Sequence, residues 1–241
     1  MTENKIRQFL PTIVGHMVKH AEGGKTPSER ELSEHLHLSR GLLRECLAVL
    51  EAVNIIERRP KSGIYLTLER AGLDSMVIMA EAGVSASRQQ LHNALELRRI
   101  HDVNAAALAA ERASEINFEA LRDILERSEE RVAKRGGLNE LDAEFHLEIV
   151  KATGNDLLYK ICASFYAARG PRVEFFFRSP ERNAASLQEH KAIYEALKSR
   201  DMLLSRAQMN AHLRSIESYW EEMFTWMGGS SDEVLPGYQE T

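Results

Sequence analysis

Residues 26–66 hold the pattern that most restricts the fold of this chain: two short helical segments joined by a tight turn and followed by two β-prone runs. Ser28 and Glu31 have the spacing of a capping box, in which the hydroxyl and the carboxylate satisfy the free amides that open a helix. Ser39 is placed to cap a second helix that starts at about residue 40. The segment therefore predicts two consecutive helices with a tight turn between them.

The second of these helices has an apolar side and a polar side. The apolar stripe consists of Leu43, Cys46, Leu47 and Leu50. The opposite side carries Arg40, Gly41, Arg44 and Ala48. Two arginines one turn apart suit the base edges and phosphates of DNA, because a recognition helix presents its N-terminal end to them. A solvated arginine face has the same pattern, so this helix alone leaves both interpretations open.

The two β-prone runs predict a hairpin with a basic tip. Ile55–Ile56 and Ile64–Leu66 flank the tip. The tip residues are Arg58, Arg59, Pro60, Lys61, Ser62 and Gly63. Gly63 lets the turn tighten without a Cβ penalty. A helix pair followed by such a hairpin is typical of a winged helix-turn-helix.

The stretch SERELSEHLHLSRGLLRECLAVLE followed by ERRPKSGIYL resembles the winged helix-turn-helix of the GntR family of bacterial transcription regulators. The resemblance implies operator contacts by Arg30, Arg40 and Arg44, and it puts Gly63 in the wing. Cys46 stands where the family usually has alanine. The full predicted DNA-binding set is Arg30, Ser39, Arg40, Gly41, Arg44, Arg58, Lys61 and Gly63.

Charged residues are distributed unevenly along the chain. Residues 1–70 carry 11 Lys and Arg against 9 acidic residues, whereas the whole chain has a net charge of −5, so the basic surplus lies in the first part. The only two cysteines are far apart and lack metal or redox spacing, which favours a reducing compartment. No signal pattern or bilayer-length apolar run is present, so we expect a cytoplasmic protein without a membrane partner.

After about residue 73 the pattern is helix after helix, with Asn117, Asn155 and Asn183 as candidate caps. The predicted helices span 73–82, 88–113, 117–135, 138–153, 156–169, 171–178, 183–200 and 202–226. We expect a mainly α protein, with a small β-hairpin wing and a C-terminal antiparallel helical bundle. The predicted domains are a winged helix-turn-helix at 1–67, a linker and connecting helix at 68–82, an all-helical effector-binding domain at 83–226, and a flexible tail at 227–241.

Four polar residues of the predicted bundle are candidate metal ligands. Asp142 and His146 are four apart and share one helical face, whereas His190 and His212 each share a face with apolar neighbours. A lone inward histidine is more often a hydrogen-bonded core residue than a ligand. Three histidines with one carboxylate suit Zn, Ni, Fe, Mn or Co, and leave positions open at an octahedral ion.

A second resemblance bears on these residues. The segments LELRRIHDVNAAALAAERAS, DAEFHLEIVKATGNDLL, EHKAIYEALKSRD and AHL resemble the FCD effector domain of the FadR subfamily of GntR regulators. The resemblance implies that a divalent ion, with Zn or Ni as the first candidates, is held by Asp142, His146, His190 and His212. It also implies that Arg98, in the E-x-R element, pairs with the carboxylate of an effector. His101 and Asp102 depart from the usual apolar residue and glutamate.

These resemblances imply a ligand-responsive bacterial transcription regulator, which we expect to be a repressor, rather than an enzyme. It would bind double-stranded operator DNA as a homodimer and sense a small organic acid. Two alternatives remain open at this point. One is a metal-dependent enzyme fused to a DNA-binding domain, and the other is a regulator that senses the metal itself.

Overall fold

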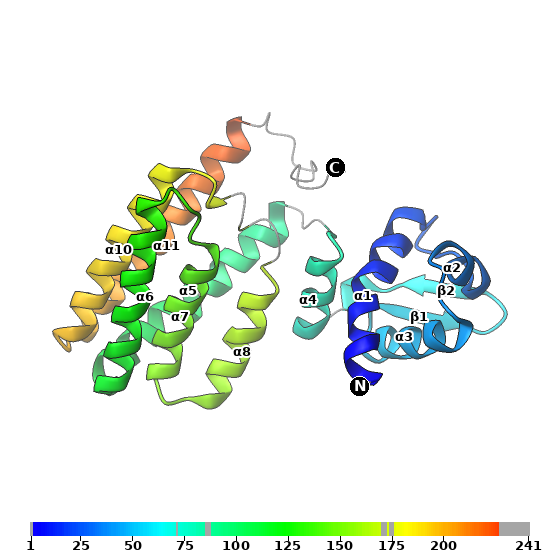
Figure 1. The fold of residues 1–241 in the computed structure, drawn as a ribbon, viewed down its shortest axis with the longest axis horizontal. Coiled ribbons are helices and arrows are strands. Elements are labelled where there is room, and N and C mark those ends of the chain that lie inside the picture. Colours follow the sequence, from blue (N-terminus) through cyan, green and yellow to red (C-terminus); the bar gives the residue numbers. More distant parts are fainter. Residues whose placement is uncertain (1, 71, 85–87, 170–172, 174–175, 227–241) are drawn as a thin grey trace. The chain divides into compact units, whose positions relative to one another are not determined.

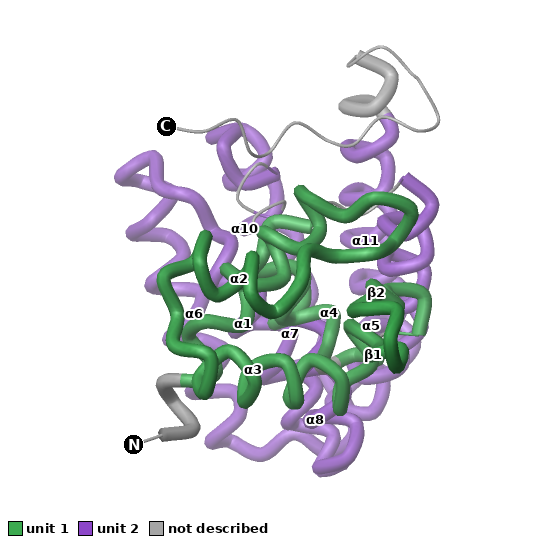
Figure 2. Tube along the Cα trace, turned by 90° about the vertical axis from the view of Figure 1, so that its right-hand side faces the viewer, with its two compact units in different colours: residues 1–85, 167–171, 237–241 green, residues 86–166, 172–236 purple. Residues whose placement is uncertain are grey.

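The computed structural model describes residues 2–70, 72–84, 88–169, 173 and 176–226 (Figure 1). The chain divides into two compact units (Figure 2). The winged unit is built mainly from the residues up to Ser85, and the helical unit mainly from Ala86–Tyr166 and Arg172–Pro236. Within the described residues, the strands form one two-stranded sheet and the other long elements are helices. The predicted fold class is therefore confirmed.

The winged unit packs four helices and a hairpin around one core. Its elements are α1 (Thr2–His20), α2 (Glu29–His35), α3 (Arg40–Ala52), β1 (Ile56–Arg59), β2 (Gly63–Leu66), a 3-10 turn (Leu68–Arg70) and α4 (Leu73–Glu81). Ile13 and Met17 of α1 are fully buried with Leu32 of α2 and Leu47 of α3. Burial of these side chains fixes the helix pair against α1, because apolar area removed from water is the main favourable term in folding.

The predicted starts of α2 and α3 are confirmed. Ser28 Oγ accepts from the Glu31 amide at 3.3 Å, and the Ser28 amide donates to Glu31 Oε2 at 2.8 Å. Ser39 Oγ accepts from the Leu42 amide at 3.3 Å. The buried stripe of α3 is the predicted one: Leu43, Cys46, Leu47 and Leu50. The opposite face of α3 is therefore left to solvent.

The predicted wing is also present. Strands β1 and β2 pair in antiparallel register, with Ile56 opposite Leu66 and Arg59 opposite Gly63. Gly63 has a φ of 129°, in the region that favours glycine, and a Cβ there would come within 3.0 Å of Lys25 Cε. A side chain at this position would thus be strained and crowded.

Beyond the hairpin, α4 packs against α1 within the winged unit. Ile78 and Met79 of α4 lie against the core of that unit. Chain beyond residue 67 therefore adds to the packing of the winged unit. The exact boundaries at 1–67 and 68–82 stay predictions.

The helical unit contains long helices over its described residues. They are α5 (Arg88–Arg112), α6 (Glu115–Ala133), α7 (Asn139–Ala152), α8 (Asp156–Ala167), α10 (Pro180–Lys198) and α11 (Met202–Trp226). The predicted helix at 171–178 lies partly outside the described residues, and the predicted tail at 227–241 lies wholly outside them. None of the described helices combines the length and apolar character that crossing a membrane requires.

The caps of these helices correct part of the sequence prediction. Asn155 does cap α8, because its Oδ1 accepts from the Leu158 amide at 3.0 Å. Helix α6 is capped by Ser114, and Asn117 is the third residue of its capping box. Helix α10 is capped by Ser179. Asn183 is buried instead, and its side chain donates to the Phe177 carbonyl at 2.9 Å.

Helix α5 lies against α7, α10 and α11. Its buried C-terminal half is rich in alanine, at positions 105, 106, 107, 109 and 110. Small side chains let neighbouring helices approach closely. The middle of α5, just before these alanines, carries the buried polar groups Arg98, His101 and Asp102 into the same bundle. This arrangement positions the polar cluster described next.

Candidate metal centre and nucleic-acid interface

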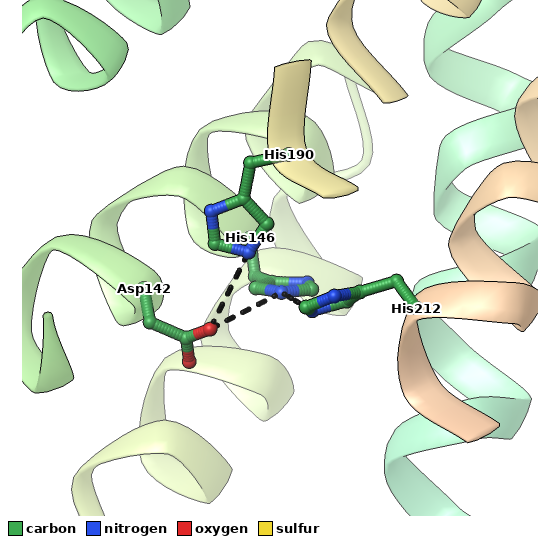
Figure 3. A group of neighbouring side chains, drawn as sticks. All are labelled: Asp142, His146, His190 and His212. Atoms are coloured by element: carbon green, nitrogen blue, oxygen red, sulfur yellow. Dashed lines mark hydrogen bonds and ion pairs between the residues drawn. The ribbon is translucent and has the colours of Figure 1, made fainter. Parts of the chain in front are cut away.

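Four predicted ligands meet inside the helical unit (Figure 3). Asp142 and His146 project from α7, His190 from α10 and His212 from α11. Each is only 1% exposed, and one ligand atom from each lies within 4.8 Å of the others. The structure thus brings together residues that the sequence places on three separate helices.

The outer nitrogens of two rings have carboxylate partners. His212 Nδ1 lies 2.7 Å from Glu189 Oε2, and His146 Nδ1 lies 3.0 Å from Asp102 Oδ2. We assign the proton of the His212 ring to Nδ1, because the Glu189 carboxylate accepts it there. We assign the His146 ring the same tautomer, because its Nδ1 lies within ion-pair distance of Asp102. Each ring then has a lone pair on Nε2. The two Nε2 atoms face each other at 3.2 Å. With both protons on Nδ1, two lone pairs meet at this distance and repel unless a cation lies between them, whereas a proton on Nε2 of either ring would make this contact a hydrogen bond.

A proton is a poor candidate for that cation near neutral pH. Burial, together with the charge of Arg98, lowers the pKa of His146 to about 4, although Asp102 and Asp142 oppose the shift. Burial also lowers the pKa of His212 to about 3, although the hydrogen bond to Glu189 opposes this. Both rings are therefore neutral at pH 7, which is the form that ligates metals.

The spacing of the ligand atoms fits a metal ion. Asp142 Oδ1 lies 3.7 Å from His146 Nε2 and 3.5 Å from His190 Nε2. Ligands about 2.1 Å from one ion are separated by about 3.4 Å at tetrahedral angles and about 3.0 Å at right angles. Among the described residues, buried His190 Nε2 finds no hydrogen-bond partner. The four residues can therefore hold a divalent ion with little movement.

Arg98 lies directly beside this cluster. Its Nη2 donates to Asp142 Oδ2 at 3.2 Å, and its Nε donates to Asp102 Oδ2 at 3.2 Å and to the Tyr166 hydroxyl at 3.1 Å. Burial lowers the pKa of Arg98, but Tyr166 and the two aspartates outweigh it and raise the pKa, so the guanidinium stays charged. Arg98 thus shares Asp142 with the candidate metal centre.

Asp102 connects most of these groups. Its Oδ2 accepts from the Tyr166 hydroxyl at 2.6 Å, and its Oδ1 lies 2.7 Å from His101 Nδ1. Burial raises the pKa of Asp102, but His146, His101 and Arg98 outweigh burial and hold the pKa well below its usual range. The carboxylate is therefore ionised, and it both neutralises Arg98 and orients His146.

Glu189 has the equivalent role for His212. Its carboxylate also pairs with Arg182 Nη2 at 2.5 Å, and Arg182 Nη1 donates to the Ser215 hydroxyl at 2.7 Å. The sequence analysis missed Glu189, Asp102 and Tyr166 as partners of the site. Only Asp102 had a sequence signal, its i, i+4 spacing from Arg98.

The winged unit presents a separate basic surface. On α3, Arg40, Gly41, Arg44 and Ala48 are all exposed, as predicted from the stripe. Arg44 Nε pairs with Glu29 at 3.0 Å, which joins the side chain to the first residue of α2. Arg30 pairs with Glu34 one turn along α2 at 3.6 Å and is largely exposed. A DNA phosphate or base edge would compete with these exposed carboxylates.

The wing residues divide into a tip and an anchor. Lys61 is exposed at the tip, and Arg59 stacks 4.1 Å from the Tyr65 ring centroid. Arg58 is only partly exposed, because its Nε lies 3.4 Å from Glu51 Oε2 of α3. Arg58 thus ties the wing to α3, Arg59 is also paired with Glu57 at 3.4 Å, and Lys61 presents its charge at the exposed tip.

Comparison with known proteins adds family membership to this geometry. Residues 93–215 match the FCD domain, which alone is half of the chain, and residues 19–66 match the bacterial regulatory proteins of the gntR family. In solved structures, Lar, described as controlling the expression of the Listeria monocytogenes agr system, has a TM-score of 0.67 at 17% identity over 89% of this chain and 96% of that one. This likeness shows the fold alone.

Three curated relatives extend over nearly the whole chain. LutR, an HTH-type transcriptional regulator of Bacillus subtilis, is 28% identical over 86% of this chain and 99% of its own length. NanR, an HTH-type transcriptional repressor of Klebsiella aerogenes, is 24% identical over 92% and 88%. The galactonate operon transcriptional repressor of Escherichia coli is 25% identical over 83% and 90%. The alternative of an enzyme fused to a DNA-binding domain is set aside by these matches. The chain is a transcription regulator of the bacterial GntR family with an FCD domain.

Proposed function

We propose that this regulator is a repressor that binds operator DNA as a homodimer and responds to a small carboxylic acid held at a metal centre in its FCD domain. The observation that carries the proposal is the convergence of Asp142, His146, His190 and His212 beside Arg98. Zn and Ni fit the donor set best, and Fe, Mn and Co also accept it. Such a protein would act in the cytoplasm, where the DNA is.

Charge supports an anionic guest only when the metal is present. Arg98 brings one positive charge, and Asp102 and Asp142 bring two negative charges, all of them buried. The metal-free cluster is thus negative by one charge, and it would repel a carboxylate. A bound divalent ion would supply two positive charges and open positions for oxygen donors. The sum then becomes positive by one, which matches a monocarboxylate.

The class of acid follows from the donor geometry that such a centre offers. A carboxylate with an α-hydroxyl or α-keto oxygen can present two oxygens to one ion, so hydroxy-, keto- and sugar acids are the favoured guests. The galactonate repressor of Escherichia coli is named for the operon of one sugar acid. Arg98 would pair with the carboxylate if that group displaced part of the contact between Arg98 and Asp142, which supports the proposal.

Regulation requires that the acid bind two arrangements of the protein unequally, since equal affinity for both shifts nothing. We infer that the acid biases how the two winged units of the dimer are held, through the chain segment that leads from each winged unit to its FCD domain. A two-fold operator would match such a dimer.

Calorimetric titration tests acid binding. Metal-loaded and chelator-treated protein would each be titrated with glycolate, pyruvate and D-galactonate, and glycolamide would serve as the neutral control. We expect saturable heat from at least one acid with the metal-loaded protein only. Equal binding to the metal-free protein would contradict the charge argument, and no binding by any of the acids would contradict the proposed acid class.

The DNA-binding face is tested by Arg44→Ala. Loss of a base contact is expected to weaken operator binding by about 1–3 kcal/mol and to relax discrimination at one base position. The operator would be enriched from genomic fragments with the protein itself and measured by fluorescence anisotropy. Arg122→Ala is the matched control. Arg122 is exposed on α6, and its substitution removes the same charge as Arg44→Ala does. Unchanged operator affinity in Arg44→Ala would remove α3 as the recognition helix.

A further inference from the structure

Three histidines lie close together on the winged unit. They do not belong to the candidate metal centre of the FCD domain, which is called the FCD cluster or FCD centre below. His16 and His20 lie one turn apart on α1, with ring centroids 4.4 Å apart. His35 of α2 brings a third ring to 5.5 Å from that of His16. His16 is half-buried, and His20 and His35 are exposed. None of the three residues belongs to the recognition helix α3 or to the wing.

The orientation of His35 favours metal ligation. Its Nδ1 lies 2.8 Å from the backbone carbonyl oxygen of Glu31. A carbonyl only accepts, so we assign the ring proton to Nδ1, and the lone pair of Nε2 is free to ligate. Histidines that bind metals commonly donate their other ring N–H in this way. His16 and His20 add the i, i+4 spacing that presents two imidazoles on one helical face.

The electrostatic surroundings favour a cation between the rings. Helix α1 ends at His20 and α2 ends at His35, so the negative ends of both helix dipoles meet at the cluster. Burial lowers the pKa of His16, and His20, His35 and Lys19 lower it further. The positive charge of Lys19 opposes a metal ion, but the same set of groups keeps His16 neutral and able to ligate.

We propose that His16, His20 and His35 form a second transition-metal site, which takes Zn, Ni or Cu and joins α1 to α2. Because His20 is exposed, rotation about its side-chain bonds can bring its lone pair to a shared point with those of His16 and of His35, whose contact with the Glu31 carbonyl is kept. Three neutral imidazoles with water in the remaining positions suit each of these ions. The ion would restrain α2, the helix that precedes the recognition helix.

The test is a metal count on the full-length protein after Zn loading and removal of excess ion. The wild type should hold two ions per chain, and both His190→Gln, which disables the FCD cluster, and His35→Ala should hold one. The double variant should hold none. His92→Ala, at an exposed histidine of α5, is the control and should keep two.

This design separates the second site from the proposed function. Loss of an ion in His190→Gln with none lost in His35→Ala would overturn the second site and leave the FCD centre standing. Loss of an ion in His35→Ala with none lost in His190→Gln would overturn the FCD centre and leave the second site standing. A spectroscopic readout guards against misfolding: Cu(II) bound to His190→Gln should show electron paramagnetic resonance splitting from imidazole nitrogens, and adding His35→Ala should remove or reduce it. An unchanged spectrum would overturn the site.

Discussion

Replacing Arg98 by alanine is expected to lower the free energy of unfolding of the helical unit by about 3–5 kcal/mol in metal-free protein. The reason is that Arg98 is the buried partner of both Asp102 and Asp142, which would be left as uncompensated charges. Urea unfolding followed by tryptophan fluorescence measures this directly. Both tryptophans, Trp220 and Trp226, belong to α11, so the signal reports on the helical unit alone.

Arg99→Ala is the matched control for this measurement. Arg99 is the next residue of α5, and its ion pair with Glu217 at 3.0 Å is partly exposed. Such a pair contributes about 0.2–1 kcal/mol, so the control should change stability little. Arg98→Lys keeps the charge and should retain most of the stability. Equal effects of Arg98→Ala and Arg99→Ala would contradict the buried network.

Replacing His190 by glutamine is expected to remove one metal ion per chain, from near-full occupancy of the FCD centre to near none. His190 supplies a buried Nε2 without a hydrogen-bond partner among the described residues, and it stacks on Phe145 with ring centroids 4.3 Å apart. Glutamine keeps much of the side-chain volume but lacks the imidazole that the ion prefers. Elemental analysis of dialysed protein gives the count.

Tryptophan fluorescence would establish that His190→Gln remains folded before its metal is counted. His92→Ala, on the exposed side of α5, should keep the full metal content. An unreduced ion count in folded His190→Gln would refute the four-residue centre, whatever the outcome at the histidines of the winged unit.

Local patterns were enough to predict α2, α3 and the wing, although no pattern predicted α1. The capping box of Ser28 and Glu31, the cap at Ser39 and the buried stripe of α3 depend on residues within one helical turn of each other, so spacing alone predicts them. The orientation of the Arg58 side chain could not be predicted from local spacing. It depends on Glu51, which α3 brings to the wing only when the unit packs.

The helical unit shows where sequence reasoning ended. The i, i+4 spacing put Asp142 and His146 on one face, but only the packing of α7, α10 and α11 brings His190 and His212 to them. Glu189 precedes His190 in the sequence and resembles a solvated charge, yet it reaches His212 on the next helix. Asn183 was wrong as a cap because Ser179 satisfies the start of α10, and packing buries Asn183 instead.

The most direct test of the account measures operator affinity of the full-length protein in four states: metal-loaded or metal-free, each with and without the acid identified by calorimetry. Fluorescence anisotropy on the enriched operator gives the four dissociation constants. The account predicts that the acid changes affinity only in the metal-loaded protein, by about 1–3 kcal/mol of coupling free energy. An equal acid effect without metal would contradict it. A change in operator affinity that the metal causes by itself, with no further change when the acid is added, would also contradict it. That result would identify the metal as the signal.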